Sequence, residues 1–482
     1  MRRRPLLFVV SAVVLVIPLT SSAQLSPTRE QAAVALRRAC EFFRNKVSAS
    51  GGYLWRYSAD LKQRAGETAA SATTIWVQPP GTPSVGEAFL TAYEATGDDY
   101  YLQLAKDAAM ALVQGQLRSG GWDYRVEFDP SERARYNYRT GPENARARNV
   151  STLDDETSQA ALSFLMRIDQ TLQQKDTTIH EAVAYAIDKL LAAQYPNGAW
   201  PQRFDAPPDP AVFPVKKASY PESWPREWPN ERYYSYYTFN DDTLADMIDT
   251  MFLAAEIYGD DRCWAAAEKA GDFILLAQMH EPQPAWAQQY DAEMHPAWAR
   301  KFEPASITGG ESQGAIRILL RIYRETGKEK YLEPIPRAIA YLEKSRLPNG
   351  QLARFYELQT NRPLFFTKDY RLTYSDEDVP THYAFKISYN SRLAQDYERA
   401  RSQPWSKPVK QEQRRPARAS ETVIAQAQAA IKSLDAEGRW LSQGRITDEG
   451  GNPTSGPVID CRTFIRNVVA LSAYLRAVST AQ

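Results

Sequence analysis

Three short acidic segments stand directly before helical patterns of apolar residues. They are DDE (154–156), NDD (240–242) and ES (311–312). One interpretation is structural: Asn240 would be an N-cap, and carboxylates in a first helical turn interact favourably with the helix dipole, by about 0.3–1 kcal/mol. The other is chemical, because carboxylate oxygens that converge without histidine are the ligands that calcium prefers. The spacing of these residues leaves both interpretations open.

Two recurring phrases describe the elements that would position these acids. An aromatic loop follows a helical stretch six times: GGYLW (51–55), GGWDYRVEF (120–128), NGAWPQRF (197–204), PAWAQQYD (284–291), NGQLARFYE (349–357) and GRWLSQG (438–444). The second phrase joins paired helices and places Gly97, Gly259 and Gly327 where a left-handed C-cap would end a helix. One hairpin cannot bury its apolar face, whereas a series can wrap around a shared core. The sequence therefore predicts an all-α toroid of tandem helical hairpins, with long loops such as 213–237 on one face.

The chain divides into four expected parts. Residues 1–23 carry arginines, an apolar run and a small-residue cleavage site, which is the layout of a secretory signal peptide. Residues 24–400 would form the toroid, and the polar, proline-containing stretch 401–420 would be a linker or surface excursion. Residues 421–482 would supply C-terminal helices that pack on the toroid, the last beginning at about Thr463. We therefore expect a secreted or periplasmic protein.

Composition excludes several classes of partner. The chain has 482 residues with 58 basic and 58 acidic side chains, and loss of residues 1–23 removes only three arginines from this balance. A nearly neutral mature chain argues against nucleic acid as the main partner. No second apolar run approaches the roughly 20 residues of a membrane span, and we expect a monomer. Cys40, Cys263 and Cys461 lack zinc spacing, and a Cys40–Cys461 disulfide stays open.

Between about residues 150 and 370 the sequence resembles the pectate lyases of polysaccharide lyase family 10. The motifs that carry this resemblance follow the family's order: STLDDETS (151–158), AAQYPNGAWPQRF (192–204), YYTFNDDTL (236–244), PAWAQQYDAEMHPAWARKFEPASITGGES (284–312) and ARFYELQTNRPLFFTKD (353–369). The family's fold is an all-α toroid, in agreement with the repeat pattern.

The resemblance implies calcium-assisted β-elimination of an acidic polysaccharide, 4-linked polygalacturonate. Asp154 and Asp241 fall on the family's aspartates at the calcium and substrate centre, and Arg300 falls on the arginine assigned as the catalytic base. The substrate-binding residues that it implies are Arg362, Lys368, Trp200, Gln202 and Gln288.

Several of these residues also have a structural interpretation. A guanidinium has a pKa above about 12, so Arg300 could simply pair with Glu303. Trp200 could pack in a loop beneath the helix tips. His382 and Tyr383 could contact substrate or only hydrogen-bond locally.

Departures from the family pattern leave two other functions open. The family's W-C-A-Q-H-D is WAQQYD (286–291) here, Asp155 and Glu156 enlarge the acidic group, and the match fades after residue 370. A toroidal glycoside hydrolase would use two of the carboxyl groups of 154–156 and Asp241, about 5–9.5 Å apart and without calcium. A carbohydrate-binding relative would have no turnover. Only elimination creates a 4,5-unsaturated uronide that absorbs ultraviolet light.

Overall fold

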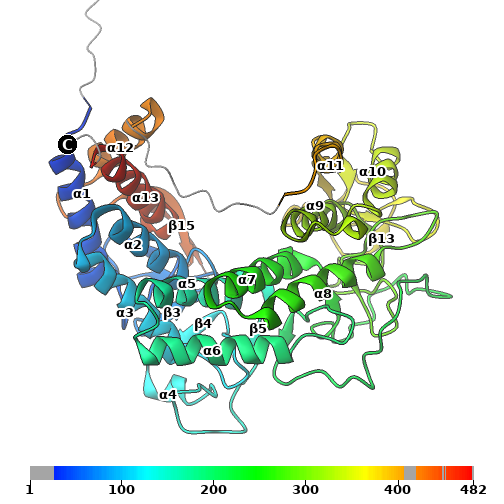
Figure 1. The fold of residues 1–482 in the computed structure, drawn as a ribbon, viewed down its shortest axis with the longest axis horizontal. Coiled ribbons are helices and arrows are strands. Elements are labelled where there is room, and N and C mark those ends of the chain that lie inside the picture. The colour runs from blue at the N-terminus through cyan, green and yellow to red at the C-terminus, as the bar shows by residue number, and fades with distance from the viewer. Residues whose placement is uncertain (1–25, 407–418, 448–449, 451, 480–482) are drawn as a thin grey trace, which may run out of the picture.

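The computed structural model of the protein describes residues 26–406, 419–447, 450 and 452–479 (Figure 1). The expected signal peptide, 1–23, and most of the expected linker, 401–420, lie outside these residues. The described part contains thirteen α-helices: α1 (Arg29–Phe42), α2 (Thr82–Thr96), α3 (Asp99–Gly115), α4 (Pro130–Arg133), α5 (Thr157–Thr171), α6 (Thr177–Ala192), α7 (Thr243–Tyr258), α8 (Asp261–Ala277), α9 (Gly309–Thr326), α10 (Ile335–Lys344), α11 (Leu393–Ser402), α12 (Glu421–Ser433) and α13 (Cys461–Val478).

Consecutive helices form hairpins whose turns follow the glycine phrase of the sequence. Gly97, Gly259 and Gly327 end α2, α7 and α9 in the left-handed conformation, with φ of 69°, 66° and 68°. The amide of each glycine donates to a carbonyl of the last helical turn, which satisfies a carbonyl that would otherwise lack a partner. Asp98 and Asp260 then cap the next helices, α3 and α8.

The hairpins stand side by side along an arc that runs from α1, α12 and α13 to α9, α10 and α11 (Figure 1). Helices α13, α2, α5, α7 and α9 line one central cavity, and α3, α6 and α8 pack behind them. Alanine-rich faces, as in α3 with Ala105, Ala108 and Ala109 fully buried, let neighbouring helices approach closely. The prediction of an all-α toroid of helical hairpins is confirmed.

Short antiparallel strands connect the ends of the helices. The strands are β1 (Arg56–Ser58), β2 (Arg64–Ala65), β3 (Thr74–Trp76), β4 (Arg125–Glu127), β5 (Ser151–Thr152), β6 (Arg203–Phe204), β7 (Tyr237–Thr238), β8 (Gln289–Tyr290), β9 (Ile307–Thr308), β10 (Leu352–Ala353), β11 (Phe355–Tyr356), β12 (Pro363–Phe366), β13 (Leu372–Thr373), β14 (Lys386–Ile387), β15 (Leu441–Thr447) and β16 (Pro453–Asp460). The pairs β3–β4, β5–β6, β7–β8 and β10–β14 stand alone, while β13-β12-β11-β9 and β15-β16-β1-β2 form four-stranded sheets. The β15–β16 hairpin was not expected from the sequence, because its alternation of polar and small residues buries little more than Ile446, Val458 and Ile459.

The C-terminal segment packs on the N-terminal end of the arc. Helix α13 begins at Cys461, two residues before the expected start, and lies against α1, α2 and α12. The ring of Phe464 stacks on that of Phe43 with centroids 3.5 Å apart. Cys40, Cys263 and Cys461 are all buried and free, so the open question of a Cys40–Cys461 bridge is answered: there is none. In the part of the chain that the structure describes, no helix combines the length and apolarity required to cross a bilayer.

Candidate active site

The acidic segments 154–156 and 240–242 share an unusual backbone conformation. Each forms a short 3-10 turn directly before an inner helix, α5 or α7, and neither helix has a side-chain N-cap hydrogen bond. The expectation that Asn240 is the N-cap is therefore wrong, because Asp242 occupies that position before α7. Left-handed backbone at residues other than glycine costs about 1–3 kcal/mol and concentrates at functional sites. The residues with positive φ are Asp155 (50°), Glu156 (59°), Asp241 (47°) and Asp242 (55°).

Strand pairs hold these two segments against the aromatic loops. β5 pairs with β6 and β7 pairs with β8. The amide of Leu153 donates to the carbonyl of Gln202 (2.9 Å), and the amide of Phe239 donates to that of Gln288 (2.8 Å). The two segments also touch each other, and Thr243 Oγ1 donates to the carbonyl of Leu153 (3.3 Å). Two equivalent repeats thus bring their acidic turns together.

Three aspartates meet where these turns touch. Asp154, Asp155 and Asp241 each place one carboxylate oxygen so that all three oxygens lie within 4.8 Å of one another. Asp154 is buried and accepts hydrogen bonds from Tyr124 Oη (2.6 Å) and Gln202 Nε2 (2.9 Å), whereas Asp155 and Asp241 are open to solvent. The structure thus brings together the two residues that the resemblance implies as metal ligands and adds Asp155.

Partial burial and neighbouring charges change the titration of Asp155 and Asp241. Partial burial, followed by the charges of Asp154 and Asp155, raises the pKa of Asp241 to about 7, against the opposing charge of Arg300. Partial burial and Asp154 likewise raise the pKa of Asp155 to about 6. Both carboxyl groups face solvent, and the neighbouring acids still disfavour their charged forms. Three hard oxygen donors whose charge the protein neutralises incompletely fit a divalent cation such as calcium.

Arg300 lies beside the acidic cluster but is itself tied to a carboxylate. Its Nε donates to Glu303 Oε2 (2.8 Å) and its Nη2 donates to Glu303 Oε1. Burial alone would lower the pKa of Arg300, but the hydrogen bonds and charge of Glu303 outweigh burial, and the net shift is upward. Burial alone would raise the pKa of Glu303, and Arg300 and Tyr383 lower it. In the free protein, Arg300 is therefore a cation.

The aromatic ring of Tyr383 completes the surroundings of this ion pair. Tyr383 Oη donates to Glu303 Oε1 (2.9 Å), and the Arg300 guanidinium lies 5.6 Å from the Tyr383 ring centroid. Phe302 packs against both Tyr383 and His382. Of the two possible roles for His382 and Tyr383, the structure shows local contacts, which orient Glu303.

A second arginine, Arg203, lies at the other end of the cluster, near Asp154. Its Nη2 donates to Tyr124 Oη (3.3 Å), which in turn donates to Asp154, and its guanidinium lies over the ring of Tyr234, 4.4 Å from the centroid. The positive charges of both Arg203 and Arg300 lower the pKa of Asp155. The acidic cluster is thus bracketed by two cations.

The remaining predicted residues differ in where the structure places them. Gln202 contacts Asp154, as above, and Gln288 is buried with both side-chain atoms making no hydrogen bond to the described protein atoms. Trp200 is fully buried and its Nε1 donates to the Leu190 carbonyl (2.8 Å). The prediction that Trp200 contacts a sugar is wrong, because the ring fills the core beneath the loop.

Arg362 and Lys368 are exposed residues on either side of the largely buried strand β12. The Arg362 guanidinium stacks on Tyr374, 3.4 Å from the ring centroid, and Lys368 Nζ pairs with Asp378 (3.0 Å). Neither residue contacts the three aspartates or Arg300 in the described structure. Their role in holding substrate stays a prediction.

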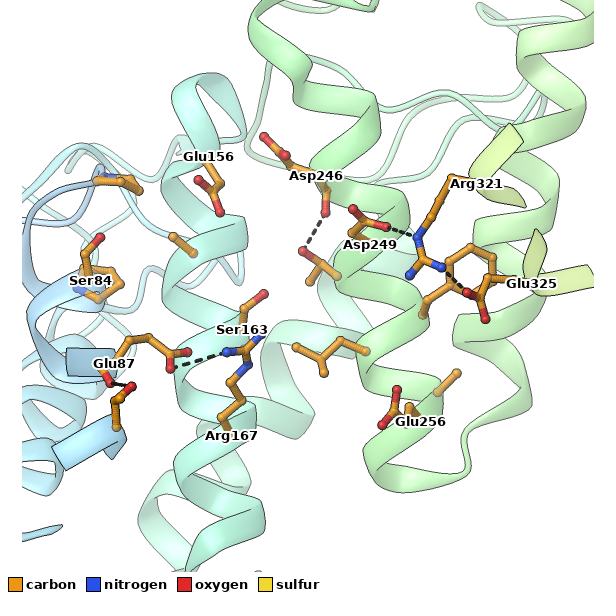
Figure 2. Close-up of a pocket in the computed structure, with 18 of the residues that line it drawn as sticks. Ser84, Glu87, Glu156, Ser163, Arg167, Asp246, Asp249, Glu256, Arg321 and Glu325 are labelled. Carbon is orange, nitrogen blue, oxygen red and sulfur yellow. Dashed lines mark hydrogen bonds and ion pairs between the residues drawn. The ribbon is translucent and has the colours of Figure 1, made fainter. Parts of the chain in front are cut away.

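A large cavity among the described inner helices is distinct from this cluster. It has a volume of about 1070 Å³, lies among the inner helices, and takes only Glu156 from the acidic segments. Figure 2 shows its ion pairs, in which Arg167 bonds Glu87 and Arg321 lies between Asp249 and Glu325. Acids outnumber arginines in this lining, which also includes Glu156, Asp246 and Glu256. We place the candidate site at the three aspartates because their oxygens converge within 4.8 Å near Arg300.

Sequence reasoning missed four residues of the site. Tyr124 and Arg203 lie within two of the recurring aromatic phrases, two residues after Trp122 and three residues after Trp200, and this proximity was the available signal. Gln78, whose Nε2 donates to Asp155 Oδ2 (2.9 Å), comes from a segment without any motif. No local pattern indicates that Tyr234 lies over Arg203, because the contact depends on the course of the loop 205–236.

The candidate site lies within a segment of the chain that matches a known family. A family model described as pectic acid lyase matches residues 116–321, which include Asp154, Asp241 and Arg300 but not Arg362 or Lys368. The match confirms the resemblance to pectate lyases and supports a carbohydrate-active enzyme of the polysaccharide lyase type. No curated protein matches the chain.

Several solved structures show weak similarity. A family 10 polysaccharide lyase from Cellvibrio cellulosa is 20% identical, with a TM-score of 0.43 over 65% of this chain and 94% of that chain. A substituted form of that lyase in complex with trigalacturonic acid is 20% identical, with a TM-score of 0.44 over 66% and 98%. A sugar epimerase from a ruminal bacterium is 10% identical, with a TM-score of 0.45 over 93% and 98%. Similarity this weak does not transfer a function.

Proposed function

We propose that this protein is a secreted, monomeric lyase that cleaves 4-linked polygalacturonate by calcium-assisted β-elimination. One observation carries the proposal: three aspartates, with oxygens within 4.8 Å of one another, lie beside Arg300 inside the segment that matches pectic acid lyase. Secretion rests on the expected signal peptide, 1–23, which lies outside the described residues.

The chemistry explains why acids and cations must lie together. β-Elimination removes the C5 proton next to a uronate carboxylate, and this proton is only weakly acidic. A calcium ion held by Asp154, Asp155 and Asp241 would supply positive charge beside that carboxylate and stabilise the charge that develops at C5. The role of the three aspartates is therefore to fix this positive charge in place.

Arg300 is the proposed proton acceptor. Its Nε and Nη2 are engaged by Glu303, so Nη1 is the nitrogen that can face a substrate. Because Glu303 favours the charged form, Arg300 must lose a proton before it can accept one, and high pH assists this step. Glu303 would then fix the orientation of the guanidinium.

The direct test is to incubate the protein with polygalacturonate and follow near-ultraviolet absorbance, with chelator and with added calcium. The proposal expects absorbance to rise only with calcium. New reducing ends without absorbance would instead indicate the hydrolase, with two of the clustered carboxyl groups as acid and base. Binding without either product would indicate the non-catalytic relative.

A further inference from the structure

Arg203 is an arginine of the cleft that has no carboxylate partner in the described structure. Its Nε is buried without a hydrogen bond, and its Nη2 reaches only the hydroxyl of Tyr124 (3.3 Å). Arg300, by contrast, has its Nε and Nη2 bonded to Glu303. Arg203 is only partly buried, and no described residue bonds its Nη1, so Nη1 and Nη2 are the nitrogens that an acidic ligand can reach.

The surroundings of Arg203 hold it in a fixed orientation. Its amide donates to the Tyr234 carbonyl (3.1 Å), and its guanidinium is stacked 4.4 Å from the Tyr234 ring and 5.6 Å from the Tyr124 ring. A guanidinium held on aromatic faces keeps its planar edge free for two parallel hydrogen bonds to a carboxylate. This geometry is that of a binding site rather than of a mobile surface side chain.

The long loop 205–236 makes contacts next to both Arg203 and Arg300. Near its end, Tyr233 and Tyr234 pack together with ring centroids 4.6 Å apart. Earlier in the loop, Trp228 Nε1 donates to the carbonyl of Ala299 (2.9 Å), the residue before Arg300. Trp228 itself is partly exposed. The loop therefore contacts Arg203 through Tyr234 and the residue before Arg300 through Trp228.

We propose that Arg203 binds the carboxylate of a second uronate unit, adjacent to the unit held at the three aspartates. The inference rests on the proposed function, which supplies a polyuronate as the ligand. It adds a specificity-determining residue: Arg203 would make the protein recognise two neighbouring acidic sugars and discriminate against a chain in which the second sugar is esterified.

The test measures calorimetric affinity for a galacturonate trimer in the presence of calcium, with the Arg300→Ala change in every protein to prevent cleavage. Arg203→Gln should weaken binding by about 10-fold or more, since a charge-assisted hydrogen bond is lost. Arg133→Gln is the matched control, because Arg133 also stacks on a tyrosine, 4.3 Å from the Tyr138 ring centroid, but lies on α4, away from the cleft.

The methyl-esterified trimer separates recognition from structure. It should bind Arg203→Gln and its parent equally, because no second carboxylate is present. The inference would be overturned if both proteins bound the free acid with equal affinity, or if Arg203→Gln lost the same affinity for both ligands. It would also be overturned if the parent did not bind the free acid. If Arg203→Gln does not fold, Arg203→Lys replaces it, because lysine keeps the positive charge. Arg203→Lys should lose less affinity for the free acid, and it should lose none for the methyl-esterified trimer.

Failure of the proposed function gives a different result. In that case the wild-type protein would form no product that absorbs ultraviolet light, whatever affinities the proteins have for the trimer. Normal wild-type turnover with unchanged Arg203→Gln affinity would overturn only the inference about Arg203.

Discussion

At the scale of single residues, two features of the site are unfavourable in the absence of a ligand. Three carboxylates lie within 4.8 Å, and the protein leaves them incompletely neutralised. Arg300, the residue proposed as the base, is hydrogen-bonded to Glu303. This interaction favours its charged form, which makes Arg300 a poor base in the free protein. Binding of a cation and an acidic substrate would offset both features. Each feature has consequences that can be measured.

The pH dependence of turnover tests the role of Arg300. Since the pKa of Arg300 is raised further by Glu303, log kcat should keep rising with pH up to about 10, without a plateau. If Asp241, with a pKa of about 7, were the base, log kcat would level off above about pH 8.

Substitution tests the same assignment independently. Arg300→Ala should reduce kcat by about 10²–10⁴-fold with folding intact. Arg262→Ala is the control, because Arg262 pairs with Asp188 and Asp260 on the exposed outside of the toroid. Wild-type turnover by folded Arg300→Ala protein would remove Arg300 from the mechanism.

The acidic cluster should make stability depend on both pH and calcium. The folded-state pKa values of Asp155 and Asp241, about 6 and about 7, lie above the usual value of 3.8. The folded state therefore holds protons that the unfolded state has released, so in chelator this contribution to stability is present at low pH and is lost as pH rises through about 7. Calcium should raise Tm at about pH 8 and much less at about pH 5, because protons compete with the ion.

Asp241→Asn provides the comparison for this prediction. It should raise Tm in chelator at alkaline pH, because one repelling charge is gone, and it should abolish most of the calcium-dependent increase. Differential scanning measurements with chelator and with calcium would check both effects. An unchanged response of Asp241→Asn to calcium would place the ion elsewhere.

At the scale of elements, the tight turns of the aromatic loops position the side chains of the site. Gly198 lies in the loop that leads to Gln202 and Arg203, and its φ is 101°. A Cβ at this position would lie 2.0 Å from the backbone oxygen of Lys269 on α8. Only glycine allows this approach of the loop to the neighbouring helix.

Gly198→Ala should lower the free energy of unfolding by more than about 2 kcal/mol, because strain and a backbone clash add together. Gly259→Ala is the matched control: it also has a positive φ, of 66°, but its Cβ would meet open space. Its cost should be about 1 kcal/mol. Chemical denaturation compares the two, and equal losses would show that the approach to Lys269 is unimportant.

Element-scale sequence patterns predicted much of this arrangement. Glycine C-caps and the repeated aromatic loops indicated hairpins that the structure confirms at Gly97, Gly259 and Gly327. The conformation of the acidic turns was not predictable, because an acid before a helix normally caps it and nothing local distinguishes Asp241 from a cap. The left-handed turn is imposed by tertiary contact between the two repeats.

At the scale of the whole molecule, the two ends of the chain stabilise each other. Helix α13 packs on α1 and α2, and β16 pairs with β1. Phe464 on α13 is 1% exposed and contacts Phe43, Phe89 and Trp440. The match to pectic acid lyase, residues 116–321, covers neither end, so sequence resemblance could not predict this contact.

Phe464→Ala should therefore destabilise the protein by about 3–5 kcal/mol, as expected for a large side chain removed from a packed core. Val469→Ala on the same helix should change stability by less than about 0.5 kcal/mol, because Val469 is 42% exposed. Both values follow from denaturant titration. A small loss for Phe464→Ala would mean that α13 is dispensable for folding.

The measurement that tests the central claim most directly is calcium add-back during turnover. Wild-type protein is treated with chelator, mixed with polygalacturonate, and followed by near-ultraviolet absorbance while calcium is titrated in. The account predicts no product before calcium, a saturable rise in rate with calcium, and no rise in Asp155→Asn/Asp241→Asn protein. A wild-type rate that is unaffected by chelator, or full calcium-dependent activity in the double variant, would contradict it.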